Sequence, residues 1–289
     1  MELSDLKVFC TVAEQGGISK AAEMLHRVPS NITARIQKLE LELGRDLFHR
    51  EKNRLRISQE GEQLLSYAQR ILSLADQAVE HLNSDVPTGV LRVGSMEAVA
   101  ASRLSSVLYD YHKAYPEVTL EVTTRPTGDL IDKVLNGQLD VALVADPLDD
   151  ARLHRLPIFE ERLVLVSDKA TTDISDPKQL GDDLTLLGFS SQCAYRNRLT
   201  QWVKQGKLTA KVVEINSYHT LLNCVTAGMG VGLVPEKLLE LYPFAKDLNT
   251  HALPDTIADT VSTAIWRKDT VRPSVSAYLD ILQAASNIQ

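Results

Sequence analysis

The chain opens with apolar residues at three-residue steps, a spacing that puts them on one face of an α-helix. These residues are Leu3, Leu6, Phe9 and Val12. The pattern stops near Gly16 and Gly17. Ser19 can then cap a second helix, KAAEMLH, whose buried face would hold Ala22 and Leu25. The start of the chain therefore predicts two short helices separated by a glycine turn.

A proline begins the next predicted helix after a short turn. Proline is tolerated in the first turn of a helix, because its missing N–H had no intrahelical acceptor anyway. Pro29 therefore starts this helix, and Gly44 supplies its end. Its apolar stripe is Ile32, Ile36, Leu39 and Leu43. Two short helices joined by a tight turn indicate a helix-turn-helix, although any small helical bundle has the same spacing.

The polar face of this third helix favours DNA binding over a plain bundle. Its first turns carry short hydrogen-bonding side chains and cations near the positive end of the helix. Such groups suit phosphates and base edges in a major groove. The predicted DNA contacts on this helix are Pro29, Ser30, Asn31, Thr33, Arg35 and Lys38.

The following stretch, LFHREKNRLRIS, predicts a basic two-stranded hairpin, or wing. Leu55 and Ile57 alternate with cations, as in a strand with one apolar face. Its arginines could reach the DNA backbone or minor groove, although a merely solvated hairpin has the same pattern. The predicted contacts are Arg50, Lys52, Asn53, Arg54 and Arg56.

A long amphipathic helix is predicted next, with Ser58 as its cap. Its broad apolar stripe must be buried against something, and a second copy of the helix is the simplest partner, since a dimer also reads two DNA half-sites. The stripe is Leu64, Leu65, Ala68, Ile71, Leu72, Ala75, Ala78, Val79 and Leu82. The segment NSDVPTG, residues 83–89, breaks the helix and predicts a domain boundary.

From residue 90 onward, short apolar runs alternate with helical patterns. This alternation predicts parallel sheets covered by helices on both faces, in about two α/β units of similar size. Ligands in such folds bind in the crevice at the carboxyl ends of the strands. The expected strands include GVLRVGS, VTLEVTT, LDVALVA, ERLVLVSDK, LTLLGF, AKVVEI, GVGLVP and STAIWRK.

Charge is distributed unevenly along the 289 residues, which carry a net charge of −7. Residues 1–58 hold ten Lys or Arg and eight Asp or Glu, whereas the remainder holds 21 against 30. A basic head on an acidic body fits a DNA-binding domain attached to a domain with another task. No run of about 18 apolar residues and no signal peptide is seen, so we expect a cytoplasmic protein without a membrane partner.

Motifs for catalysis or metal binding do not emerge from the sequence. The three cysteines are widely spaced, which fits a reducing compartment, and His26, His49 and His219 lack metal-ligand spacing. The run GMGVG precedes a strand, which favours a tight turn over a dinucleotide fingerprint. We therefore expect neither an enzyme nor a cofactor. The alternatives are a solute-binding protein and an enzyme fused to a DNA-binding segment, each weakened by these observations.

Several longer motifs resemble the LysR-type transcriptional regulators over nearly the whole chain. They are SKAAEMLHRVPSNITARIQKLELELGRDLFHR in the head and YPEVTLEV, GQLDVALV and AGMGVGLVPE in the second half. SQCAYRNRLTQW resembles the Cys-x-Tyr-Arg motif of one subgroup. The resemblance implies an α/β protein with an all-α winged helix-turn-helix head, a dimerising linker helix and an effector domain like a periplasmic binding protein. It also implies a homotetramer on double-stranded promoter DNA, controlled by a small-molecule co-inducer.

On this resemblance, residues 1–58 form the head, 59–88 the linker and 89–289 the effector domain. Subdomain I would comprise residues 89–161 and 267–289, and subdomain II residues 162–266. Crossover strands near 160–166 and 262–267 would join them. The head departs from the common pattern, because Pro29 stands where a base-reading glutamine is usual and Ala34 where an arginine is usual. A wing arginine is replaced by Asn53, so the preferred DNA sequence should differ from that of typical members.

The effector is expected between the two subdomains, at helix N-termini that carry hydroxyl groups. Such helix ends favour a carboxylate or similar anion, although Glu97 would suit an amine. Ser95 and Thr127 could equally be ordinary helix caps, and Cys193 could instead act as a redox sensor, since a helix N-terminus and Arg196 would favour its thiolate. The predicted effector contacts are Ser95, Met96, Glu97, Thr127, Gly128, Ser190, Ser191, Cys193 and Arg196.

Overall fold

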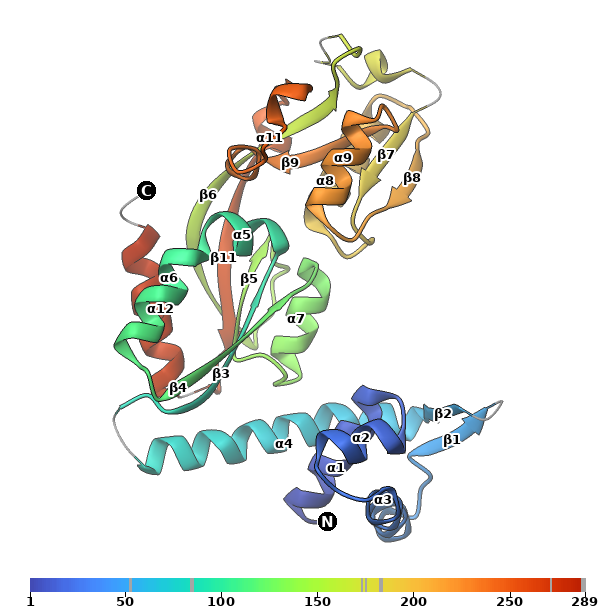
Figure 1. The fold of residues 1–289 in the computed structure, drawn as a ribbon, viewed down its shortest axis with the longest axis vertical. Helices are drawn as coiled ribbons and strands as arrows, with labels where there is room; N and C mark the ends of the chain where they lie inside the picture. The colour runs from blue at the N-terminus through green and yellow to red at the C-terminus, as the bar shows by residue number, and fades with distance from the viewer. Residues whose placement is uncertain are drawn as a thin grey trace. The chain divides into compact units, whose positions relative to one another are not determined.

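The computed structural model describes residues 1–51, 54–83, 86–172, 174, 176–181, 184–270 and 272–286. Its contacts divide the chain into two compact units: residues 1–83 with 136–138, and residues 84–135 with 139–289. This division falls within the segment 83–89 that the sequence predicted as a boundary. We call the first unit the head with its linker helix, and the second the effector domain (Figure 1).

The head contains the three predicted helices, α1 (Leu3–Gln15), α2 (Ile18–Met24) and α3 (Pro29–Leu43). Gly16 and Gly44 end α1 and α3 in the left-handed conformation that glycine adopts without strain. The prediction that Ser19 caps α2 is wrong, because the cap position is Gly17 and Ser19 lies inside the helix. The core of the head is apolar: Leu6, Phe9, Val12, Ala21, Ala22, Ile32, Ile36, Leu39, Leu47 and Ala68.

The wing and the linker helix follow. Strands β1 (Phe48–Glu51) and β2 (Arg54–Ile57) pair antiparallel, so the head is not all-α. The long helix α4 (Gln59–Asn83) begins as predicted, with the Ser58 hydroxyl accepting a hydrogen bond from the Gly61 N–H at 2.9 Å. Several apolar side chains of its predicted stripe remain exposed in the single chain: Ile71, Ala78, Val79 and Leu82.

The effector domain is built on one nine-stranded mixed sheet, ordered β4-β3-β5-β11-β6-β9-β7-β8, with β10 paired to β6. Subdomain I holds the parallel strands β3 (Gly89–Ser95), β4 (Val118–Thr124) and β5 (Val141–Ala145). Its helices are α5 (Glu97–Ser102), α6 (Leu104–Ala114), α7 (Thr127–Leu135) and α12 (Pro273–Ser286). Strands β4 and β5 lie on either side of β3, so the connection from β3 to β4 and the connection from β4 to β5 run in opposite directions. The helices of these connections, α6 and α7, therefore cover opposite faces of the sheet (Figure 1).

Subdomain II repeats this arrangement with parallel strands β7 (Thr185–Gly188), β8 (Lys211–Glu214) and β9 (Val231–Pro235). Its elements also include α8 (Ala194–Gln205), α9 (Tyr218–Thr226), α10 (Glu236–Leu239) and β10 (Leu248–His251). Shorter segments are the 3-10 helices Pro177–Leu180 and Ala245–Asp247 and the helix α11 (Asp255–Ala258). The first three residues of GMGVG form the predicted tight turn before β9, where Gly228 has φ +74° and a Cβ on Gly230 would lie 2.4 Å from the Thr185 carbonyl oxygen.

Two long antiparallel strands, β6 (Leu153–Asp168) and β11 (Asp259–Arg267), join the subdomains. The first half of β6 pairs with β11, and its second half pairs with β9 and β10. All of β11 therefore belongs to the sheet of subdomain I, since it also pairs with β5. The sequence predicted that the second part of subdomain I begins at residue 267. The strand pairing instead places this beginning at about residue 259.

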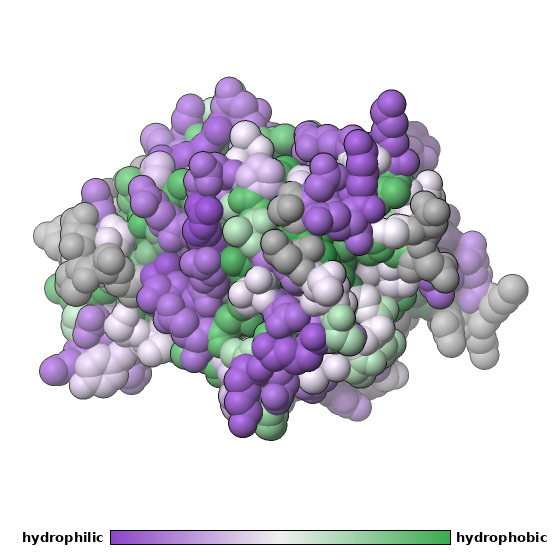
Figure 2. Space-filling model, turned by 90° about the horizontal axis from the view of Figure 1, so that it is seen from above, coloured by the Kyte–Doolittle hydropathy of each residue, from purple (hydrophilic) through white to green (hydrophobic). Residues whose placement is uncertain are grey.

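The surface of the molecule seen in Figure 2 is mostly hydrophilic, with apolar side chains in small separate areas. Isolated apolar side chains of this kind are ordinary on a protein surface. Among the described helices, none combines the length and apolar content needed to cross a lipid bilayer.

Candidate DNA-binding and effector sites

The exposed side of α3 provides the candidate DNA-binding surface. Ile32, Ile36 and Leu39 point into the head, so the intervening residues of the first turns face solvent. We call this exposed set the recognition face: Pro29, Ser30, Asn31, Ala34, Gln37 and Lys38. Arg27, in the turn before α3, donates a hydrogen bond to the Asn31 side-chain oxygen at 3.3 Å and adds a cation that the sequence had not singled out.

Three predicted DNA contacts have partners inside the head. The Thr33 hydroxyl donates to the Pro29 carbonyl at 3.0 Å. Arg35 and Lys38 both bind Asp5 of α1, at 2.6 and 2.9 Å, and the Asp5 side chain is only 1% exposed. The Arg35 guanidinium therefore joins α3 to α1, and its contact with DNA stays a prediction. Lys38 remains more than half exposed and can still reach a phosphate.

Replacing Asp5 with asparagine is expected to lower the stability of the head by about 1–3 kcal/mol, because two charged hydrogen bonds are lost. Burial acts to raise the pKa of Asp5, but the hydrogen bonds and charges of Lys38 and Arg35 outweigh it and hold the pKa below its ordinary value. This contribution is therefore complete above the ordinary carboxylate pKa and is lost only as the pH falls through the lowered one. Hydrogen exchange of α1 and α3, followed as a function of pH in the unaltered protein and in Asp5→Asn, measures this contribution to stability. Equal protection of the two proteins at pH 7 would contradict the prediction.

The wing is only partly described. Arg56 is exposed and pairs with Glu51 at 3.2 Å, a surface ion pair that DNA phosphates could replace. The predicted contacts Lys52 and Asn53 lie outside the described residues, as do the side chains of Arg50 and Arg54.

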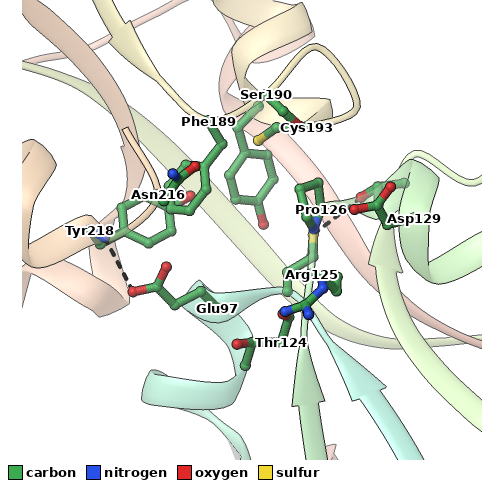
Figure 3. A pocket seen from close by; sticks show the side chains of 13 residues that line it. Glu97, Thr124, Arg125, Pro126, Asp129, Phe189, Ser190, Cys193, Asn216 and Tyr218 are labelled. Atoms are coloured by element: carbon green, nitrogen blue, oxygen red, sulfur yellow. Dashed lines mark hydrogen bonds between the residues drawn. The ribbon is translucent and has the colours of Figure 1, made fainter. Parts of the chain in front are cut away.

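The candidate effector site is a cavity of about 350 Å³ between the two subdomains. Loops that follow β3 and β4 in subdomain I, and β7 and β8 in subdomain II, converge on it, so it lies at the carboxyl ends of parallel strands. The residues of this effector cavity are Met96, Glu97, Thr124, Arg125, Pro126, Thr127, Asp129, Phe189, Ser190, Cys193, Tyr195, Asn216 and Tyr218 (Figure 3).

Five of the nine predicted effector contacts line the cavity: Met96, Glu97, Thr127, Ser190 and Cys193. The other four predictions are corrected. Ser95 is fully buried at the end of β3 and donates to the Met96 carbonyl at 3.0 Å, so it neither caps α5 nor meets the cavity. Gly128 and Ser191 do not line the cavity either. The Gly128 N–H donates a hydrogen bond to the Gln192 carbonyl oxygen, and the Ser191 carbonyl oxygen accepts one from the Asn197 side-chain amide.

Arg196 is the fourth correction. Its guanidinium donates to the Phe189 carbonyl at 2.8 Å and lies 3.5 Å from the Glu214 carboxylate, away from the cavity. Sequence reasoning missed eight lining residues, of which Thr124, Arg125, Pro126 and Asp129 adjoin Thr127 and could have been found from that loop alone. The others required knowledge of which side chains point inward.

Three hydroxyl groups in or beside the cavity form few or weak hydrogen bonds. The Tyr195 side chain is 2% exposed; its hydroxyl lies close to the Ser262 hydroxyl of β11, and neither hydroxyl has a further hydrogen-bond partner among the described residues. The Thr127 hydroxyl makes only contacts of 3.4 Å, to Met96 Sδ and the Ala145 backbone. Buried hydroxyls normally form hydrogen bonds. These groups are therefore suited to a polar atom of a ligand.

Cys193 occupies the cap position of α8, but its surroundings do not favour a thiolate. Burial raises the pKa of the Cys193 thiol, and the N–H groups of Tyr195 and Arg196 and the Arg196 charge offset only part of this effect. Reactive cysteines have lowered pKa values. The raised pKa therefore weighs against Cys193 as a redox sensor. No group of three His, Cys, Asp or Glu side chains within the described ranges gathers as a metal ion would require.

Family descriptions match both parts of the chain. Residues 3–62 match the bacterial regulatory helix-turn-helix protein, lysR family, and residues 84–287 match the LysR substrate binding domain. The HTH-type transcriptional regulator CzcR of Bacillus anthracis is 35% identical over 291 residues, covering 100% of this chain and 99% of the relative. The HTH-type transcriptional regulator SoxR of an Arthrobacter species is 36% identical, covering 93% and 92%.

Solved structures share the fold. A full-length OxyR variant from Pseudomonas aeruginosa has a TM-score of 0.72 at 23% identity, covering 100% of this chain and 95% of the other. CbnR, a LysR family transcriptional regulator, has a TM-score of 0.69 at 21% identity, covering 99% of each chain. The fold and the two sites define a DNA-binding transcriptional regulator with an effector-binding domain. The chain belongs to the family of LysR-type transcriptional regulators.

Proposed function

We propose that the recognition face and the wing bind promoter DNA, and that a small carboxylate-bearing metabolite in the effector cavity modulates this binding. The observation that carries the DNA-binding part is the set of exposed polar side chains on the first turns of α3, within a winged helix-turn-helix. CbnR, whose fold is similar (TM-score 0.67, 21% identity), has been solved in complex with its target DNA, which supports the proposal.

The carboxylate is proposed from the groups at the α7 end of the cavity. Arg125 has no carboxylate within ion-pair distance among the described residues, although its guanidinium donates to the neighbouring Thr124 carbonyl at 2.9 Å. The Tyr195 hydroxyl and the weakly bonded Thr127 hydroxyl add hydrogen-bond donors. An arginine and several donors around one position are suited to an oxyanion.

A dimer is proposed through α4. Its exposed apolar side chains would be covered by the same helix of a second copy, and two heads would then meet two DNA half-sites. The homotetramer and the Cys-x-Tyr-Arg subgroup implied by the family resemblance remain predictions.

Replacing Asn31 with alanine is expected to weaken the specific DNA complex about 5- to 150-fold, since one base contact is worth about 1–3 kcal/mol. The measurement uses the full-length protein and a duplex selected from random sequence, with fluorescence anisotropy at fixed salt concentration. Affinity for an unselected duplex serves as the internal control and should stay the same, because that affinity rests on phosphate contacts. Equal losses on both duplexes would contradict a base-reading role for Asn31.

A further inference from the structure

Glu97 brings into the effector cavity a carboxylate oxygen for which the described part of the chain offers no partner. Its Oε1 accepts a hydrogen bond from the backbone N–H of Tyr218 at 3.2 Å, which joins subdomain I to subdomain II. Within the described residues, Oε2 has no hydrogen-bond donor, and no Lys, Arg or His lies within 4.0 Å of this carboxylate. Figure 3 shows this second oxygen directed toward the interior of the cavity.

The Glu97 side chain is half-buried, so its charge is only partly hydrated. Charged groups withdrawn from water are normally paired with an opposite charge or neutralised. Burial raises the pKa of Glu97, and the Tyr218 N–H and the neighbouring His219 offset only part of this effect. A cation supplied by a ligand would provide the missing partner.

The charges that line the cavity lead to the same conclusion. Glu97 and Asp129 carry two negative charges, and Arg125 carries the single positive charge of the lining. A ligand with carboxylates alone would therefore meet a lining of net negative charge. A ligand that also carries a cation meets attraction at both ends.

Aromatic rings surround the same end of the cavity as Glu97. The Phe189 and Tyr218 rings lie 4.7 Å apart at 49°, and both line the cavity. Figure 3 shows Phe189, Asn216 and Tyr218 on the Glu97 side, with Arg125 and Asp129 toward the other side. Aromatic faces attract ammonium groups, and an amide oxygen accepts their hydrogen bonds.

We propose that the effector is a small zwitterion of the amino-acid type, whose ammonium group binds between Glu97, Asn216 and the Phe189–Tyr218 ring pair. Its carboxylate binds at the end of the cavity that Arg125 and Tyr195 form. This inference therefore rests on the proposed function of the cavity. Because Glu97 belongs to subdomain I while the rings belong to subdomain II, the ammonium group contacts both. The cavity volume, at the small end of the range for ligand sites, suits a metabolite of this size.

The test is a thermal-shift screen of full-length protein with the twenty standard amino acids, followed by calorimetric titration of each hit. Every hit is compared with its N-acetyl derivative and with the carboxylic acid that lacks the amine. We expect at least one free amino acid to bind, and removal or acetylation of its amine to weaken binding at least tenfold. Glu97→Gln, which keeps the shape of the side chain, should weaken the amino acid tenfold and leave the deaminated acid unchanged. Glu121→Gln, an exposed residue of β4, is the matched control.

Three outcomes overturn the inference: no amino acid binds in a Glu97-dependent way, the deaminated acid binds as tightly as the amino acid, or Glu97→Gln leaves the affinity unchanged. The comparison of ligands on the unaltered protein keeps the test decisive if Glu97→Gln does not fold. If a deaminated acid binds and Thr127→Trp abolishes its binding, the cavity assignment stands and only the ammonium site fails.

Discussion

Replacing Thr127 with tryptophan is expected to abolish the response to effector while DNA binding persists. The Thr127 side chain is 6% exposed and lines the effector cavity next to Met96 and the Ala145 backbone. An indole at this position fills space that the ligand needs, so we expect effector affinity to fall at least about 100-fold, or about 2.7 kcal/mol. The measurement is calorimetric titration of the effector, together with DNA affinity by anisotropy.

A matched pair from the facing subdomain serves as the control. Ser190 lines the cavity, whereas its neighbour Ser191 is exposed and outside it. Ser190→Trp should reproduce the loss, and Ser191→Trp should leave effector binding as it is. Retention of effector binding in both Thr127→Trp and Ser190→Trp would refute the cavity assignment.

Replacing Asp140 with alanine is expected to destabilise the effector domain by about 3–5 kcal/mol, because it leaves a buried charge uncompensated. Asp140 Oδ1 lies 2.7 Å from Arg272 Nη1, and both side chains are less than 5% exposed. The other Asp140 oxygen accepts from the Arg92 N–H at 2.8 Å, and Arg272 also donates to the Val90 carbonyl at 2.7 Å. The pair therefore ties the start of α12 to β3.

Tryptophan fluorescence during urea unfolding measures this loss in the full-length chain. The two tryptophans, Trp202 and Trp266, both lie in the effector domain and report on it alone. Glu240→Ala, which removes an exposed ion pair to Lys237, is the control and should change stability little. A loss for Asp140→Ala as small as that of the control would show that the buried pair does not hold this end of the domain.

The helices and strands could be predicted because each buries a continuous apolar face. Ile32, Ile36 and Leu39 at helical spacing determined α3, and Pro29 and Gly44 determined its ends. The lengths of β6 and β11 could not be read in this way, because PIFEER and DTVST carry charges and hydroxyls that suit a loop as well as an exposed strand. Their pairing with each other decides the structure, and with it the subdomain boundary.

The sites were harder to predict than the fold, because a site depends on where side chains point. The loop at Thr127 follows a predicted strand, so its position at the crevice was expected, and five predicted contacts do line the cavity. Ser95 and Arg196 lie beside lining residues in sequence but turn into the core and toward Glu214. Likewise, nothing in the sequence indicates that buried Asp5 binds Arg35 and Lys38 from a helix thirty residues away.

We expect the effector cavity and the DNA-binding face to be coupled. Linkage requires that an effector that changes DNA affinity by some factor has its own affinity changed by DNA by that same factor. The direct measurement is a pair of titrations on the full-length protein: effector affinity with and without the selected duplex, and duplex affinity with and without effector. We expect the same factor, different from one, in both titrations. In Thr127→Trp, the same effector concentration should leave the duplex affinity unchanged. An effector that binds the cavity while both factors equal one would contradict this coupling.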